Sequence, residues 1–162
     1  MNLTGRLSVE ELCSHTLESA LGANLIAHGE RVVDIGSGAG FPGLPLTVYR
    51  PDLWMTLVEP RGRRAAFLRH VVRELALSHV AVTQGRIENV GGQTFGTATT
   101  RAVGGLARWI ANAPFLRPGG ALLVWTTEPE KVALELPAFS LQTTVAIPKS
   151  SRRVIAVYRK RP

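Results

Sequence analysis

Short runs of β-branched and apolar residues recur along the chain and predict its strands. Seven such runs are present, at 31–35, 54–59, 80–84, 97–102, 120–125, 139–147 and 152–158. Runs of this length and composition, bounded by turn residues, are typical of strands in a sheet. Only a turn-rich Pro-Lys-Ser-Ser segment joins the last two runs, which is too short for a helical crossover. These two strands are therefore expected to form an antiparallel hairpin.

Segments with helical periodicity separate the strands. The expected helices lie at 43–50, 61–77 and 103–113, and one or two more lie at 8–27, where Ser8 and Glu11 have the spacing of a capping box. In the segment 61–77 the apolar residues recur at spacings of three and four, which predicts a face that packs on the sheet and contains Ala65, Leu68, Val72 and Leu75. Strands that alternate with helices form a mainly parallel, doubly wound α/β sheet. We expect a single domain, with residues 1–28 as a helical cover and residues 29–162 as the α/β core.

A glycine-rich segment after the first predicted strand gives the first chemical signal. Residues 34–43 read Asp-Ile-Gly-Ser-Gly-Ala-Gly-Phe-Pro-Gly, and Gly36, Gly38 and Gly40 let a ligand approach the backbone closely. A dinucleotide fingerprint would have its third glycine where Phe41 stands, and no phosphate-loop Gly-Lys-Ser or Gly-Lys-Thr follows. The pattern favours S-adenosylmethionine and the Rossmann-like methyltransferase fold. A nicotinamide cofactor and a tight turn without ligand remain as alternatives.

Further candidates stand where the second, third and fourth predicted strands end. Glu59 is placed to accept the ribose hydroxyls of a nucleoside, although an exposed strand-end charge would look the same. Ile87 and Glu88 stand where an adenine ring would lie in this fold. Arg101 is expected at the edge that faces cofactor and target, and it is the best candidate for a role in the reaction.

Composition and charge limit the class of protein. The 162 residues, 45% of them hydrophobic, fit one globular domain, and neither a long apolar run nor a secretory signal is present, so we expect a cytoplasmic protein. The only cysteine is Cys13 and the four histidines do not cluster, so no disulfide and no metal site are expected. A formal net charge of +7, mostly from arginine, favours a polyanionic partner such as RNA, although a solvated basic surface has the same composition.

The residues near the predicted site restrict the methyl acceptor. Methylation at carbon 5 of a pyrimidine needs a thiolate nucleophile, and Cys13 lies upstream of the first strand. The Asn-Pro-Pro-Tyr type of clamp for exocyclic amino groups is absent from residues 99–103, which read Thr-Thr-Arg-Ala-Val. A ring nitrogen such as guanine N7 already presents a lone pair and requires positioning without an obligatory base. No catalytic acid, base or nucleophile is therefore expected, and a protein that only binds the cofactor would look the same.

The chain resembles the RsmG (GidB) family of methyltransferases, which act on guanine N7 in bacterial small-subunit ribosomal RNA. The likeness is carried by residues 34–46 together with Arg-Pro-Asp at 50–52. The Phe-Pro-Gly part is the most distinctive, and the resemblance covers most of the chain. It implies S-adenosylmethionine as cofactor, ribosomal RNA or the small subunit as partner, and cofactor contacts that include Gly36, Phe41, Ile87, Glu88 and Arg101. The basic pair Arg63 and Arg64 matches a pair that would face RNA, or else it is solvated helix charge. The alternative function is a cofactor-binding module of the same fold with lost or altered activity.

The chain departs from the family pattern at three places. It begins at Asn-Leu-Thr, where family members usually carry further amino-terminal helices. Gly96 stands where an aspartate is usual. The fifth predicted strand leads through Trp125 into a pair of threonines, where a Lys-Gly pair is usual.

Overall fold

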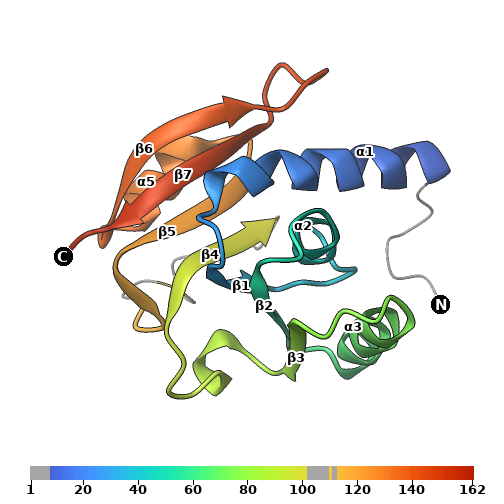
Figure 1. Ribbon diagram of the computed structural model, residues 1–162. Coiled ribbons are helices and arrows are strands. Elements are labelled where there is room, and N and C mark those ends of the chain that lie inside the picture. The colour runs from blue at the N-terminus through green and yellow to red at the C-terminus, as the bar shows by residue number, and fades with distance from the viewer. Residues whose placement is uncertain (1–7, 102–109, 111–112) are drawn as a thin grey trace.

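A seven-stranded sheet forms the centre of the computed structural model, which describes residues 8–101, 110 and 113–162 (Figure 1). The strands are β1 (Arg31–Ile35), β2 (Trp54–Glu59), β3 (Val80–Gln84), β4 (Phe95–Arg101), β5 (Leu116–Thr126), β6 (Phe139–Ala146) and β7 (Val154–Lys160). Their order in the sheet is β3-β2-β1-β4-β5-β7-β6. Strands β1 to β5 are parallel, and β7 pairs antiparallel with both β5 and β6. The prediction of a mainly parallel sheet with a terminal antiparallel hairpin is confirmed.

Helices cover both faces of this sheet. They are α1 (Val9–Ala20), α2 (Gly43–Tyr49), α3 (Gly62–Glu74) and α5 (Pro129–Glu135), with 3-10 turns η1 (Leu21–Leu25) and η2 (Ile87–Asn89). Apolar residues of η1, α2 and α3 share one core cluster with β1 and β2, whereas α5 packs against a second cluster on the other face. None of the described helices is long and apolar enough to cross a membrane.

The amino-terminal helix α1 begins where the sequence predicts. The Ser8 hydroxyl accepts a hydrogen bond from the Glu11 amide at 3.2 Å, and the Glu11 carboxylate accepts one from the Ser8 amide at 2.7 Å. This reciprocal pair satisfies two amides that the first helical turn leaves without partners. The helix packs beside α2, at the same end of the molecule as the loop after β1 (Figure 1).

Several predicted boundaries are wrong, each for a local reason. Helix α3 ends at Glu74 because Ala76 adopts a left-handed φ of 50°, which leaves Leu75 53% exposed instead of packed. Strand β7 begins at Val154, two residues later than expected, because the Arg153 amide donates to the Ser150 hydroxyl within the turn at 2.9 Å. Helix α5 was not predicted, since its segment reads as hydrophilic. The helix expected at 103–113 falls mainly on 102–109 and 111–112, outside the described residues.

Parallel pairing brings the carboxyl ends of the central strands to one edge. In the register of β1 and β2, Ile35 lies opposite Val58, and in that of β1 and β4, Asp34 lies opposite Thr99. The segments that follow β1, β2 and β4 therefore meet at this carboxyl edge, which is where ligands bind in open α/β sheets.

Candidate functional site

The glycine-rich loop leaves β1 in a conformation that suits glycine alone. Gly36, Gly38 and Gly40 have φ values of 72°, 57° and 100°. The amides of Gly36 and Ser37 both donate to the Val58 carbonyl of β2, at 2.9 and 3.1 Å, which holds the loop against the neighbouring strand. A β-carbon on Gly38 would have no neighbour closer than 3.6 Å. The loop therefore presents bare backbone at this position without a close steric neighbour, as a ligand-binding loop requires.

Glu59, the last residue of β2, is buried against this loop and is not an exposed strand-end charge. Its side chain lies at the end of β2 and the residue is 3% exposed. One carboxylate oxygen accepts the Gly38 amide at 2.9 Å, and the other accepts the Arg61 amide at 2.8 Å. Each oxygen can accept a second hydrogen bond. Glu59 thus fixes the loop and keeps acceptor capacity for a hydroxyl.

Asp34, the last but one residue of β1, carries a buried carboxyl group beneath the loop. It is fully buried, and its Oδ1 accepts the Thr99 hydroxyl at 2.8 Å, whereas Oδ2 has no partner among the described residues. Burial raises the pKa of Asp34 to about 6, against the hydrogen bond from Thr99, which lowers it.

The glycine of the Phe-Pro-Gly segment is explained by this packing. A β-carbon on Gly43 would lie 2.8 Å from Asp34 Oδ2 and would also collide with the side chain of Leu57. Any larger residue at the start of α2 would push the helix away from β1 and β2. The most distinctive part of the motif thus has a packing role that sequence reasoning did not assign.

Arg101 lies at the end of β4 and is held by α1. Its Nη2 donates to Glu18 at 2.9 Å and lies 2.7 Å from Nδ1 of His15. The His15 ring in turn meets the Phe41 ring edge-on, with centroids 5.8 Å apart. Helix α1 therefore connects Arg101 to the glycine-rich loop, because His15 contacts both Arg101 and Phe41.

The carboxylate of Glu18 is the centre of this arrangement, and the sequence did not indicate it. Glu18 is 5% exposed and also forms an ion pair with Arg153, with 2.6 Å between Nη1 and Oε1. Burial lowers the pKa of Arg101, and the negative charge of Glu18 opposes that effect. Nη1 of Arg101 is buried and has no partner among the residues that the structure describes.

The remaining predicted residues are only partly gathered at the site. The Gly85 amide donates to the Glu59 carbonyl at 3.1 Å, which brings the segment after β3 to the site. Ile87, however, is 3% exposed and packs in the core, whereas Glu88 is exposed. Nη1 of Arg64 would lie 3.7 Å from a β-carbon on Gly38, so this side chain lies over the loop.

The basic pair is therefore split. Arg63 is exposed on α3, whereas Arg64 is half-buried beside the loop. Side chains of adjacent helix residues point in different directions, and only that of Arg64 lies near Gly38. The sequence predicts that Arg63 and Arg64 face RNA as a pair, whereas in the structure only Arg64 lies at the cofactor loop.

Two departures from the family pattern have structural partners. The Glu30 carboxylate fills the space that a side chain at position 96 would occupy, and it pairs with Arg117 at 2.7 Å. Glycine at position 96 is thus matched by a carboxylate that comes from another segment. The Trp125 indole donates to the Glu18 carbonyl at 2.9 Å and is 5% exposed, so it anchors the end of α1 on β5.

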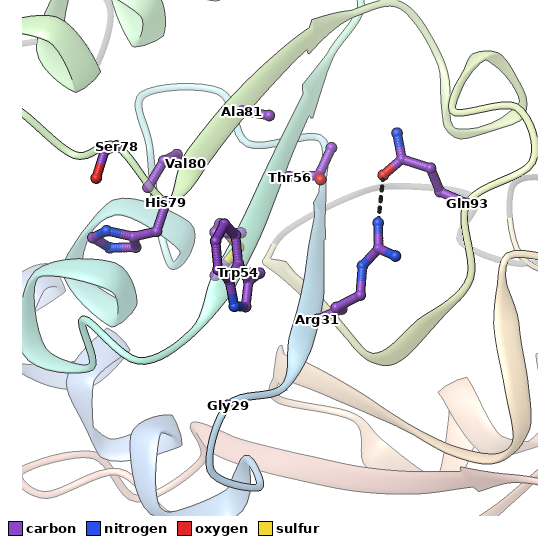
Figure 2. Close-up of a pocket in the computed structure, with 10 residues that line it drawn as sticks. Gly29, Arg31, Trp54, Thr56, Ser78, His79, Val80, Ala81 and Gln93 are labelled. Atoms are coloured by element: carbon purple, nitrogen blue, oxygen red, sulfur yellow. Dashed lines mark hydrogen bonds between the residues drawn. The ribbon is translucent and has the colours of Figure 1, made fainter.

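A cavity of about 600 Å³ lies at the opposite edge of the sheet. It is lined by Arg31, Trp54 and Val80, the first residues of β1, β2 and β3, together with His79 (Figure 2). Because these residues start their strands, the cavity is remote from the loop at the carboxyl edge. It is not the predicted site.

A second cavity lies next to the amino-terminal helix. An apolar cavity of about 440 Å³ lies between α1 and α2 and is lined by Leu17, Phe41, Leu44 and Tyr49. Among the described residues there is no group of three or more His, Cys, Asp or Glu side chains that could hold a metal ion.

Comparisons with solved structures show the fold. A SAM dependent methyltransferase from Aquifex aeolicus superposes with a TM-score of 0.74 at 16% identity, over 94% of this chain and 93% of that one. TrmN from Thermus thermophilus superposes with a TM-score of 0.71 at 18% identity, over 90% of this chain and 48% of that one. The Rossmann-like methyltransferase fold is confirmed.

Comparisons with sequences show the family. The Ribosomal RNA small subunit methyltransferase G of Mycobacterium leprae (strain TN) is 49% identical over 118 residues, covering 67% of this chain and 46% of the relative. The protein of the same name from Streptomyces avermitilis is 40% identical over 139 residues, covering 84% of this chain and 58% of the relative. The chain spans about half the length of the curated relatives that it matches. The family described as rRNA small subunit methyltransferase G matches residues 1–156, and the chain belongs to it.

Proposed function

We propose that this chain binds S-adenosylmethionine and transfers its methyl group to guanine N7 in small-subunit ribosomal RNA, as a single methyltransferase domain in the cytoplasm. The observation that supports this most is the loop of left-handed glycines, which the buried Glu59 holds at the carboxyl edge beside Arg101. The family to which the chain belongs supports the choice of substrate.

The residues present fit this cofactor. The bare backbone at Gly36 and Gly38 would take its amino acid end, and the free acceptor sites of Glu59 would take its ribose hydroxyls. The segment at Ile87 and Glu88 would lie by the adenine, through its backbone more than through the buried Ile87 side chain. When bound, S-adenosylmethionine supplies a methyl group activated by its sulfonium charge.

The protein's contribution to the reaction is positioning. Guanine N7 presents a lone pair without losing a proton, so no general base is required, and holding the two reactants in line lowers the barrier. Arg101 is fixed by His15 and Glu18, and its buried Nη1 donor is unused among the described residues. This arrangement suits a residue that orients the target base or the cofactor's charged end.

The charge of the chain and the place of Arg64 support an RNA substrate. A net charge of +7 attracts a polyanion, and the half-buried Arg64 lies over the loop where the target nucleotide would enter. The exposed Arg63 is available to a phosphate further out.

Cofactor binding is tested first, by calorimetric titration with S-adenosylhomocysteine and, separately, with NADH. We expect heat with the former and none with the latter, because the loop lacks the third glycine of a dinucleotide fingerprint. Heat with NADH alone would contradict the assignment of the cofactor.

Methyl transfer is tested with labelled S-adenosylmethionine and small ribosomal subunits that lack the guanine modification. We expect label in the ribosomal RNA, and none with subunits that already carry the modification. Tight S-adenosylhomocysteine binding without any label in RNA would leave only a cofactor-binding role.

A further inference from the structure

The turn between β6 and β7 is strongly basic. Residues 147–153 read Ile-Pro-Lys-Ser-Ser-Arg-Arg, with three basic residues and no acidic one. Lys149 and Arg152 are exposed, whereas Arg153 is half-buried. Within the part of the chain that the structure describes, neither Lys149 nor Arg152 has an ion-pair partner, so both charges are available to a ligand.

This turn lies at the same edge of the sheet as the cofactor loop. Strand β7 runs antiparallel to β5, with Val154 opposite Thr126 at the carboxyl end of β5. In the parallel pair of β4 and β5, Arg101 lies opposite Trp125. The start of β7, and with it the turn, therefore lies at the same end of the sheet as the end of β4, with only β5 between them. Figure 1 shows the β6–β7 connection next to α1.

The turn is also held in place. Arg153 binds Glu18 of α1 at 2.6 Å, and Ser150 accepts the Arg153 amide at 2.9 Å within the turn. Glu18 in turn binds Arg101 at 2.9 Å. One buried carboxylate thus fixes both the turn and the arginine at the site, so the ligand does not have to order the backbone of the turn.

The turn and Arg64 stand on opposite sides of the site. Arg64 follows β2, and the sheet order β2-β1-β4-β5-β7 places the glycine-rich loop and Arg101 between it and the turn. A nucleic-acid strand whose target base enters at the loop would pass both groups. The backbone on either side of that base would then meet arginine or lysine, which bind phosphates.

We propose that the turn at 147–153 is an RNA-backbone contact, in which Lys149 and Arg152 bind phosphates on one side of the target nucleotide. The proposal rests on the proposed function, because it requires that the substrate is RNA. Phosphate contacts carry no sequence information, so the turn sets affinity and register and leaves the choice of base to the site.

The test compares two double variants at the two ends of β7. Lys149→Gln/Arg152→Gln removes two charges from the turn, and the control Arg159→Gln/Arg161→Gln removes two exposed charges from the opposite end of the strand. Binding to a fluorescent single-stranded fragment of unmodified small-subunit ribosomal RNA is measured between about 50 and 200 mM salt. Calorimetry with S-adenosylhomocysteine checks that each variant retains its site.

We expect the turn variant to bind RNA at least tenfold more weakly at low salt. Its slope of log affinity against log salt should fall by about 1.4, since each phosphate contact to a single strand contributes roughly 0.7. The control should keep the affinity and slope of the parent protein, and all three should bind S-adenosylhomocysteine equally. An equal loss of RNA affinity in both variants, or no loss in either, would overturn the proposed contact at the turn and leave the proposed function standing. Failure of the parent protein to bind RNA would overturn the proposed function with it.

Discussion

The substitution Asp34→Asn removes an ionisable group from the buried end of β1 and keeps the shape of the side chain. The asparagine oxygen can accept the Thr99 hydroxyl as Oδ1 does now. What disappears is the cost of holding a carboxylate where burial raises the pKa to about 6. The variant therefore isolates one electrostatic contribution to folding beneath the cofactor loop.

The size of this contribution follows from the shift. The pKa of Asp34 rises from 3.8 to about 6, so the folded state binds its proton more tightly than the unfolded state. Stability that comes from the neutral form is complete below pH 3.8 and is lost as the pH rises through 6. At 1.36 kcal/mol for each pKa unit, the loss amounts to about 3 kcal/mol.

Urea unfolding of both proteins from pH 4 to pH 8 measures this loss. Relative to the parent, Asp34→Asn should become more stable by roughly 2 kcal/mol between pH 4 and pH 8, most of it between pH 4 and 6, since the rest of the about 3 kcal/mol lies below pH 4. Other groups cancel in the comparison, including Asp52, whose pKa Arg50 holds well below its usual range. Parallel curves for the two proteins would show that Asp34 is not held in a poorly solvated site.

Three further changes test the site and the fold. Gly38→Val should abolish S-adenosylhomocysteine binding, since its side chain would take the place of the ligand and a β-branched residue disfavours a φ of 57°, while the circular dichroism spectrum stays nearly unchanged because the loop lies outside the helices and strands; retained affinity would contradict the placement of the loop. Leu68→Ala should lower the free energy of unfolding by about 2 to 5 kcal/mol because Leu68 is buried, whereas Leu75→Ala should lower it by less than about 0.5 kcal/mol. A larger loss at Leu75 would mean that α3 continues past its observed end. Glu18→Gln should lower the free energy of unfolding by about 2 kcal/mol, because it leaves two guanidinium groups without their carboxylate. The control Glu10→Gln, on the same helix, should leave stability nearly unchanged. Similar urea midpoints for the two variants would refute the anchoring role of Glu18.

The central strands were predictable because each is a short β-branched run bounded by turn residues. The bounds of β1, β2 and β3 agree with the sequence pattern. Strands β1 and β2 are buried, whereas the edge strand β3 is only partly buried, so the turn residues that bound each run mark these strands better than burial does. The end of α3 was not predictable from periodicity, because Leu75 continues the apolar pattern while Ala76 turns left-handed. Local backbone conformation decided that boundary, and hydrophobic spacing does not encode it.

The loop half of the site was predictable, and the α1 half was not. The glycine spacing and the position of Glu59 at a strand end indicate the cofactor loop directly. The carboxylate of Glu18 meets guanidinium groups that are 83 and 135 residues away in the chain, and no local pattern connects them. The Glu30 carboxylate, which occupies the space beside Gly96, is likewise brought there by the fold from a distant part of the chain.

The most direct test of the account is the position of the methyl group after the reaction. Small ribosomal subunits without the modification are incubated with this protein and labelled S-adenosylmethionine, and the RNA is digested to nucleosides. The account predicts label in 7-methylguanosine, and its loss when Gly38→Val replaces the parent protein. Label in any other nucleoside, or equal labelling by the variant, would contradict the assignment of the loop and of the reaction.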